Sequence, residues 1–108
     1  MSDAPIRQAA EVHKAGQRAG CLTENVDGQF IFTYDTDYTG PPISLALPVR
    51  EAAYTWSKFP PFFDGLLPEG AQLDALLRTL KVDRHDYFAQ ILAVGEDLVG
   101  DVTVHHEA

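Results

Sequence analysis

Histidine and cysteine are the residues of this chain with the greatest potential for chemistry, and they are few. The 108-residue sequence holds four histidines and one cysteine. His105 and His106 are adjacent, and neighbouring side chains on a strand point to opposite faces, so the pair is poorly placed to chelate one metal ion. His13 and His85 have no cysteine or carboxylate at the spacing typical of metal ligands. The sequence therefore predicts no metal site.

Phosphoryl transfer and nucleophilic catalysis each require patterns that this sequence lacks. A phosphoryl-transfer site needs a phosphate-binding loop, a metal-holding carboxylate and a positioned base. Gly95 and Gly100 flank two acidic residues, which is typical of a helix end and a turn, not of a phosphate-binding loop. No serine lies in a Gly-x-Ser-x-Gly pattern, and Cys21 is interpreted as a small buried hydrophobic residue. We expect a protein that is not an enzyme and needs no cofactor.

The charge of the chain restricts its partners. The net charge is −8, and the eight lysines and arginines are scattered along the sequence. Nucleic acid and anionic lipid would repel such a chain, so no direct nucleic-acid or membrane binding is expected. Every apolar run is interrupted well short of the roughly 20 residues that span a bilayer. A single cysteine fits a reducing compartment and predicts a cytoplasmic protein.

The first half of the chain has the patterns of β-strands. Residues 1–10 are predicted to be a loosely ordered start, and residues 11–108 a single domain. A hairpin is expected from residues 11–15 and 18–24, joined at Gly16 and Gln17. The turn at residues 25–28 contains Asp-Gly, the strongest turn signal in the chain.

The turn leads into another predicted strand, residues 29–34, with Phe30, Phe32 and Tyr34 on one face. Residues 35–42 are expected to be a loop. Alternation of Ile43, Leu45 and Leu47 then predicts one more strand, which ends at a proline.

The second half is predominantly helical by pattern. Leucines at i, i+3, i+4 and i+7 predict an amphipathic helix that begins near Glu69. Asp83 is the expected N-cap of a second helix, and Gly95 its expected left-handed C-cap. The helical positions predicted to face the core are Leu73, Leu76, Leu77, Leu80, Tyr87, Phe88, Ile91 and Leu92.

A closing strand is expected over residues 99–105, with Val102 and Val104 on one face. The order of elements predicts an α+β fold, with a small, mostly antiparallel sheet and two to three helices.

Between the two halves, residues 54–70 form an aromatic, proline-rich segment. It contains the only tryptophan, three of the six phenylalanines and three of the seven prolines. Neither a helix nor a central strand tolerates that proline density, so a rigid irregular stretch or a single turn is expected. Phe62, Phe63, Leu66 and Leu67 have the spacing of an inward face. Trp56 lies among polar neighbours, which leaves open whether it covers the core or anchors a partner.

Three motifs resemble the N-terminal subdomain of the HipA kinase family. They are Pro-Ile-Ser-Leu-Ala-Leu-Pro at residues 42–48, Phe-Pro-Pro-Phe-Phe-Asp-Gly-Leu-Leu-Pro-Glu-Gly at residues 59–70, and Val-Gly-Glu-Asp-Leu-Val-Gly at residues 94–100. The second motif is the specific one, and the third would be weak alone. Asp101 stands where many relatives have alanine, which is a minor departure.

The resemblance implies a function through binding. In long members of the family this subdomain precedes a kinase core, and no kinase motif follows it in this sequence. The chain is therefore similar to the small HipS-like antitoxin of HipBST-type operons. The implied partners are a HipT-like serine/threonine kinase toxin, neutralised in trans, and a HipB-like DNA-binding protein within a larger complex.

The aromatic segment is the expected contact with the kinase. Trp56 is expected to approach its nucleotide site as an anchor, with its neighbours shaping the presenting turn. The predicted partner-binding residues are Trp56, Lys58, Phe59, Phe63, Asp64, Leu67 and Glu69. Three alternatives remain: a structural subunit that completes the kinase without inhibiting it, an enzyme with an unrecognised site, and a piece of a longer kinase.

Overall fold

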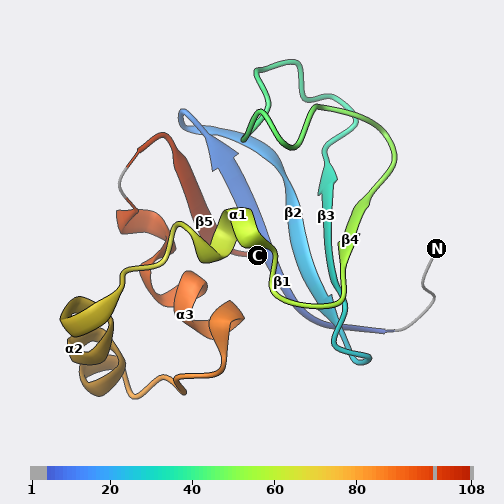
Figure 1. Cartoon of the computed structure of the whole chain (residues 1–108). Helices are drawn as coiled ribbons and strands as arrows, with labels where there is room; N and C mark the ends of the chain where they lie inside the picture. Colours follow the sequence, from blue (N-terminus) through green and yellow to red (C-terminus); the bar gives the residue numbers. More distant parts are fainter. Residues whose placement is uncertain (1–4, 99, 108) are drawn as a thin grey trace.

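The sheet is the frame of the molecule, and the helices cover one of its faces (Figure 1). The computed structural model describes residues 5–98 and 100–107. Five antiparallel strands lie in the order β4-β3-β2-β1-β5. The elements are β1 (Ile6–Lys14), β2 (Gln17–Asn25), β3 (Phe30–Tyr34), β4 (Tyr54–Trp56), α1 (Pro61–Asp64), α2 (Gly70–Leu80), α3 (Tyr87–Val94), the 3-10 turn η1 (Gly95–Asp97) and β5 (Val102–His106). This arrangement confirms the predicted α+β class.

The first hairpin is longer than its sequence pattern indicates. Its turn residues are Ala15 and Gly16, with φ values of 51° and 82°, one position earlier than predicted. Ile6 pairs with Asn25 at the far end of the hairpin, and the amide of Val26 donates to the carbonyl of Pro5 at 3.0 Å. Residues 6–10, expected to be loosely ordered, are therefore held in β1 by backbone pairing with β2.

The turn between β2 and β3 has the structure that its Asp-Gly signal predicts. Gly28 has a φ of 79°, which favours glycine. The side-chain carbonyl of Asn25 accepts hydrogen bonds from the amides of Asp27 and Gln29, both at 3.0 Å. This buried asparagine closes the turn and fixes the register of β2 against β3, which places Phe30, Phe32 and Tyr34 on one face.

The strand predicted from Ile43, Leu45 and Leu47 is wrong. Ser44 and Leu47 form an isolated bridge around a turn. The amide of Leu47 donates to the carbonyl of Ser44 at 3.0 Å, and the amide of Ala46 donates to the Ser44 hydroxyl at 3.1 Å. The Ser44 side chain thus forms a local hydrogen bond that favours a turn over an extended strand. Ile43 and Leu47 are buried, whereas Leu45 is 95% exposed at the tip.

The aromatic segment contains a strand that its sequence did not predict. β4 pairs with β3 in the register Phe30 with Trp56 and Phe32 with Tyr54. α1 then forms a single helical turn that begins at Pro61, a position where proline has no intrahelical hydrogen bond to lose. The prolines therefore define the start of α1, and the strand lies in the proline-free part of the segment.

The predicted helices are present, but two of their ends differ from expectation. α2 begins after Glu69, as predicted. The N-cap of α3 is Asp86, whose side chain accepts from the amide of Ala89 at 3.0 Å, and not Asp83. Asp83 instead accepts from the amide of His85 in the preceding turn at 2.7 Å.

Gly95 is in the right-handed helical region, with a φ of −57°, so it is not a left-handed C-cap. It is the first residue of η1, which follows α3 directly. Position 95 requires glycine because its backbone lies close to β5: an added Cβ would lie 2.0 Å from the carbonyl oxygen of Val104.

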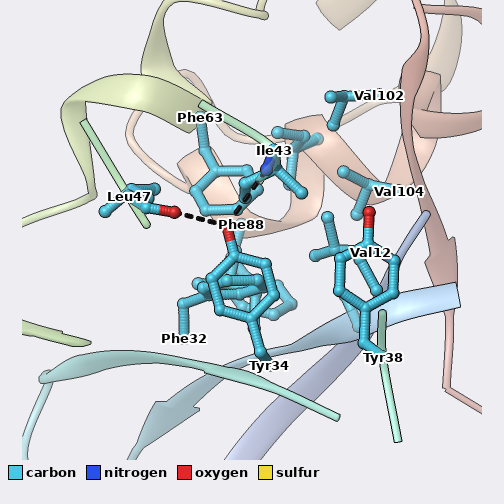
Figure 2. Close-up of a cluster of buried hydrophobic side chains, with 14 of the residues drawn as sticks. Val12, Phe32, Tyr34, Tyr38, Ile43, Leu47, Phe63, Phe88, Val102 and Val104 are labelled. Atoms are coloured by element: carbon cyan, nitrogen blue, oxygen red, sulfur yellow. Dashed lines mark hydrogen bonds between the residues drawn. The ribbon is translucent and has the colours of Figure 1, made fainter. Parts of the chain in front are cut away.

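One hydrophobic core lies between the sheet and the helices. Figure 2 shows Phe63 of α1 and Phe88 of α3 facing Phe32 and Val12 of the sheet. The hydroxyl of Tyr34 bridges the long loop, since it donates to the carbonyl of Leu47 at 2.5 Å and accepts from the amide of Ile43 at 3.0 Å (Figure 2). The buried Tyr34 side chain thus holds the loop that leads into β4 against the core.

The helical stripe is only partly buried. Leu77 lies in the interior, as do Phe88 and Ile91, whereas Leu80 and Tyr87 are exposed. Val102 and Val104 are both buried on the core face of β5, as predicted. Among the described residues, no helix is both long enough and apolar enough to cross a bilayer.

Candidate protein-binding site

Trp56 occupies the last position of the edge strand β4. The pairing of Trp56 with Phe30 places its indole on the same face of the sheet as the core. It packs against that core but is only half-buried. Its ring stacks on that of Tyr54, with centroids 6.2 Å apart and planes 18° from parallel. The indole therefore covers the margin of the core and also presents surface to solvent.

A row of aromatic rings continues from β3 to α3. The ring of Phe59 meets Phe30 edge-on, with centroids 5.3 Å apart, and lies 5.7 Å from the ring of Tyr87. Tyr87 is 42% exposed at the first position of α3. We call these residues, together with Tyr54 and Trp56, the aromatic row: Phe30, Tyr54, Trp56, Phe59 and Tyr87. Their edges supply the amphipathic contact area that protein interfaces favour.

The predicted partner-binding residues separate into an exposed and a buried group. Lys58, Asp64 and Glu69 are exposed, and Phe59 is half-buried. Phe63 and Leu67 lie in the core, so they can act on a partner only by holding the segment in place.

Backbone bonds connect the two groups. The amide of Asp64 donates to the carbonyl of Pro60 at 3.0 Å, and the amide of Leu67 donates to the carbonyl of Asp64 at 3.2 Å. Trp56 and Phe59 come together in the aromatic row, because Trp56 pairs with Phe30 and the ring of Phe59 contacts that of Phe30. Asp64 and Glu69 lie farther along the chain, at the end of α1 and the N-cap of α2.

Tyr54 and Tyr87 belong to this surface but were not selected from the sequence. Tyr87 has the helical spacing of a core residue, and only the N-cap at Asp86 reveals that it begins the helix. Tyr54 is held by its hydroxyl, which donates to the carbonyl of Pro48 at 2.5 Å, and by the guanidinium of Arg50, 3.6 Å from its ring centroid. These contacts fix β4 against the preceding loop.

The opposite face of the sheet is polar and paired internally. Arg18 lies 3.0 Å from Asp35, 3.2 Å from Glu11 and 3.6 Å from Glu107. Glu11 also contacts His13 at 3.0 Å, and this hydrogen bond, with the nearby Arg18 charge, lowers the pKa of its carboxyl group. Arg18 is thus shared among three carboxylates on this face.

Two histidines meet on this polar face. The rings of His13 and His105 lie 4.2 Å apart, and His105 contacts Glu96 at 3.2 Å. His13 therefore has a carboxylate partner, Glu11, contrary to the sequence interpretation. Among the described residues, no group of three or more cysteine, histidine or acidic side chains is arranged to hold a metal ion.

Cys21 is half-buried on β2, not fully buried as predicted. Burial, together with the nearby Glu107 carboxylate, raises the pKa of its thiol to about 11. The thiolate is the reactive form of cysteine, so this side chain is poorly suited to act as a nucleophile near neutral pH.

The comparisons with known proteins identify the domain. The family model described as HipA N-terminal domain matches residues 10–105. A solved structure of the N-terminal domain of HipA toxin superposes with a TM-score of 0.75 and 31% identity, over 100% of this chain and 98% of its own. The match is to the N-terminal domain of HipA and not to a kinase catalytic domain.

Curated relatives contain the domain in two settings. An uncharacterised protein of Haemophilus influenzae is 31% identical over 100 residues, which are 93% of each chain. Two Sinorhizobium fredii proteins named as candidate kinases, Y4dM and Y4mE, are 34% and 32% identical over 88% and 79% of this chain. The matched region is only 26% and 21% of those two proteins. On the family match and the Haemophilus relative together, this chain belongs to the HipA N-terminal domain family.

Proposed function

We propose that the chain is an antitoxin that binds a HipT-like serine/threonine kinase toxin in trans and inhibits it in the cytoplasm. Membership of the HipA N-terminal domain family relates the chain to a toxin, since the similar solved structure is the N-terminal domain of HipA toxin. The observation that carries the proposal is the Haemophilus influenzae relative, which this domain covers over 93% of its length. A relative of that extent shows the domain as nearly a whole protein, which supports a function in trans.

The aromatic row supplies the proposed contact with the kinase. Rigid aromatic side chains lose little conformational entropy when they dock, and tryptophan and tyrosine dominate interface hot spots. Trp56 is half-buried in β4 and buttressed by Tyr54, so its ring is already oriented before a partner arrives. We expect it to approach the nucleotide site of the kinase, with Lys58 and Phe59 beside it.

The remaining predicted residues position this contact. Phe63 and Leu67 hold α1 and the following turn in the core. Asp64 and Glu69 are exposed near the two ends of that turn and add negative charge. In a chain of net charge −8, such a surface complements an electropositive site such as one that binds nucleotide phosphates.

The test is inhibition of kinase activity by the purified chain. We expect the wild-type chain to suppress autophosphorylation of a HipA-family kinase core from the same genome, with its own N-terminal domain absent. Trp56→Ala should weaken inhibition by roughly ten- to a thousandfold, as truncation of a central aromatic hot spot does. Thr55→Ala is the matched control, because Thr55 is its exposed neighbour in the same strand and points to the other face. Unchanged inhibition by a folded Trp56→Ala protein would remove Trp56 from the mechanism.

A second candidate function is a structural subunit that completes a kinase without inhibiting it. The two Sinorhizobium relatives favour this alternative, since the domain forms about a quarter or less of proteins named as candidate kinases. The same assay separates the two functions. Kinase activity that stays constant or rises when the chain binds supports the structural role.

A HipB-like DNA-binding protein is the third proposed member of the assembly. The net charge of −8 opposes direct contact between this chain and DNA, so DNA binding is assigned to that partner. Co-purification of the three proteins tests this arrangement.

A further inference from the structure

Leu45 is the most exposed large hydrophobic side chain in the part of the chain that the structure describes. It is 95% exposed, whereas the next, Ile6, is 62% exposed. Leu45 lies at the tip of the turn that Ser44 and Leu47 close. Turn tips favour glycine, asparagine, aspartate and serine, which are compatible with water and with turn backbone conformations. A leucine at such a position gains nothing for the folding of this chain.

The turn holds Leu45 outward by a set of fixed contacts. The amides of Ala46 and Leu47 both donate to Ser44, and the Tyr34 hydroxyl bonds both flanks of the turn. Ile43 and Leu47 are buried on either side of the tip (Figure 2). Because both flanks are anchored in the core, the turn cannot fold over to bury Leu45 without breaking those contacts. The turn therefore keeps Leu45 exposed.

The surroundings of Leu45 are apolar. No charged residue occurs in residues 38–49, in a chain with 24 charged side chains among 108 residues. Several small or apolar neighbours are exposed with it, namely Pro41, Ala46, Pro48 and Val49. We call these residues with Leu45 the apolar tip. A projecting apolar tip on an otherwise strongly acidic surface is suited to enter an apolar recess on a protein.

The apolar tip and the aromatic row are mechanically connected through Tyr54. The Tyr54 hydroxyl holds the carbonyl of Pro48, at the end of the tip, and its ring stacks on Trp56. The loop of residues 35–53 extends from the end of the sheet where β3 stops and β4 begins (Figure 1). Tyr54 therefore contacts both the apolar tip and the Trp56 end of the aromatic row.

We infer that Leu45 is a second anchor, which inserts into an apolar recess of the same kinase that the aromatic row contacts. The inference rests on the proposed function. A second copy of this chain fits less well, because a projecting tip meeting its own copy buries far less than the roughly 800 Å² per partner of a stable interface. Two chains of net charge −8 also repel each other. In this arrangement Leu45 contributes affinity alone, whereas Trp56 contributes affinity and also blocks the nucleotide site.

The experiment measures affinity and inhibition separately. The probe is the purified HipA-family kinase core used above, and the dissociation constant is measured by calorimetry. Leu45→Ser should raise the dissociation constant roughly ten- to a hundredfold, since it removes one buried aliphatic side chain from the complex. The melting temperature should not change, because Leu45 makes no buried contact within the chain. At saturating concentration the variant should still inhibit fully, unlike Trp56→Ala.

Val26→Ser is the matched control. Val26 is an apolar residue, 58% exposed, in the turn between β2 and β3. It lies outside the apolar tip and the aromatic row, so its replacement should leave the dissociation constant within about twofold of wild type.

Each other outcome overturns a distinct claim. If the wild-type chain does not bind the kinase core, both the proposed function and this inference fail. If wild type binds and inhibits while Leu45→Ser binds equally tightly, only the role of Leu45 fails. If the chain alone is a dimer in sedimentation equilibrium and Leu45→Ser makes it a monomer, the apolar tip belongs to self-association instead.

Discussion

A single hydroxyl group determines how the long loop between β3 and β4 is held. The Tyr34 hydroxyl, buried in the core, donates to Leu47 and accepts from Ile43. Removing it in Tyr34→Phe leaves two backbone groups without their partner, and an unsatisfied buried group costs about 1 to 3 kcal/mol. We expect the free energy of unfolding to fall by about 2 to 3 kcal/mol, measured by urea denaturation.

The control for this prediction removes the same hydroxyl group from a tyrosine at an exposed position. Tyr87→Phe also deletes one tyrosine hydroxyl, but at a ring that is 42% exposed. Its effect on unfolding should stay within about 0.5 kcal/mol. Equal stability of the two variants would show that the loop does not depend on the Tyr34 bridge.

Residue type alone was sufficient to select Trp56 but insufficient to find its neighbours. A single tryptophan among polar residues suggests a side chain at the margin of the core, and the indole of Trp56 is indeed half-buried. Tyr87 and Phe30 join it only through the tertiary packing of α3 against the sheet. No local pattern contains that information, since the residues are far apart in the sequence.

At the scale of elements, Gly95 controls how α3 meets β5. The backbone of Gly95 lies so close to β5 that an added Cβ would be 2.0 Å from the Val104 carbonyl oxygen and 2.9 Å from the Val104 Cβ. Gly95→Ala must therefore displace η1 from β5. We expect a loss of at least about 2 kcal/mol in the free energy of unfolding, measured by thermal or chemical denaturation.

Gly65→Ala provides the matched comparison. Gly65 also follows a helix with a right-handed φ, −66°, but an added Cβ there would meet its nearest atoms at 3.5 Å, an ordinary contact. This variant should be neutral or slightly stabilised, by up to about 1 kcal/mol, because alanine restricts the unfolded chain. A stable Gly95→Ala protein would contradict the close approach.

The elements predicted correctly are those whose signal is local. Asp-Gly at residues 27–28 and the leucine period of α2 identify a turn and a helix without reference to the rest of the chain. The errors occur where tertiary contacts override the pattern. Alternation at residues 43–47 predicted a strand, but the burial of Ile43 and Leu47 is achieved by a turn clamped by Tyr34.

Two further differences between the predicted and the observed elements also result from tertiary contacts. β4 is three residues long and owes its existence to pairing with β3, which no periodicity over so short a span can reveal. The sequence position of Gly95 indicates the end of a helix, yet a glycine is needed there because β5 leaves no space for a side chain. The sequence thus supports the class of fold and singles out Trp56, whose role as an anchor is a prediction, whereas the surface around Trp56 depends on packing.

The whole molecule combines an apolar edge with a long-range negative field. In the proposed complex with the kinase, we expect the aromatic row and the apolar tip to supply short-range contacts, whereas the net charge of −8 acts over the distance of the Debye length. The two kinds of interaction affect different steps of association. Electrostatic attraction accelerates the encounter, and buried apolar contacts slow dissociation.

Salt should therefore change the association rate of the complex with the kinase much more than its dissociation rate. Between about 50 and 500 mM NaCl, we expect the association rate constant to fall at least tenfold, because screening removes the attraction between the acidic chain and an electropositive nucleotide site. The dissociation rate constant should change by less than about threefold. Surface plasmon resonance with immobilised kinase measures both. Trp56→Ala serves as the opposite case, since it should raise the dissociation rate and leave the salt dependence of association intact. A dissociation rate that rises steeply with salt would instead mean that ion pairs, and not the aromatic edge, hold the complex together.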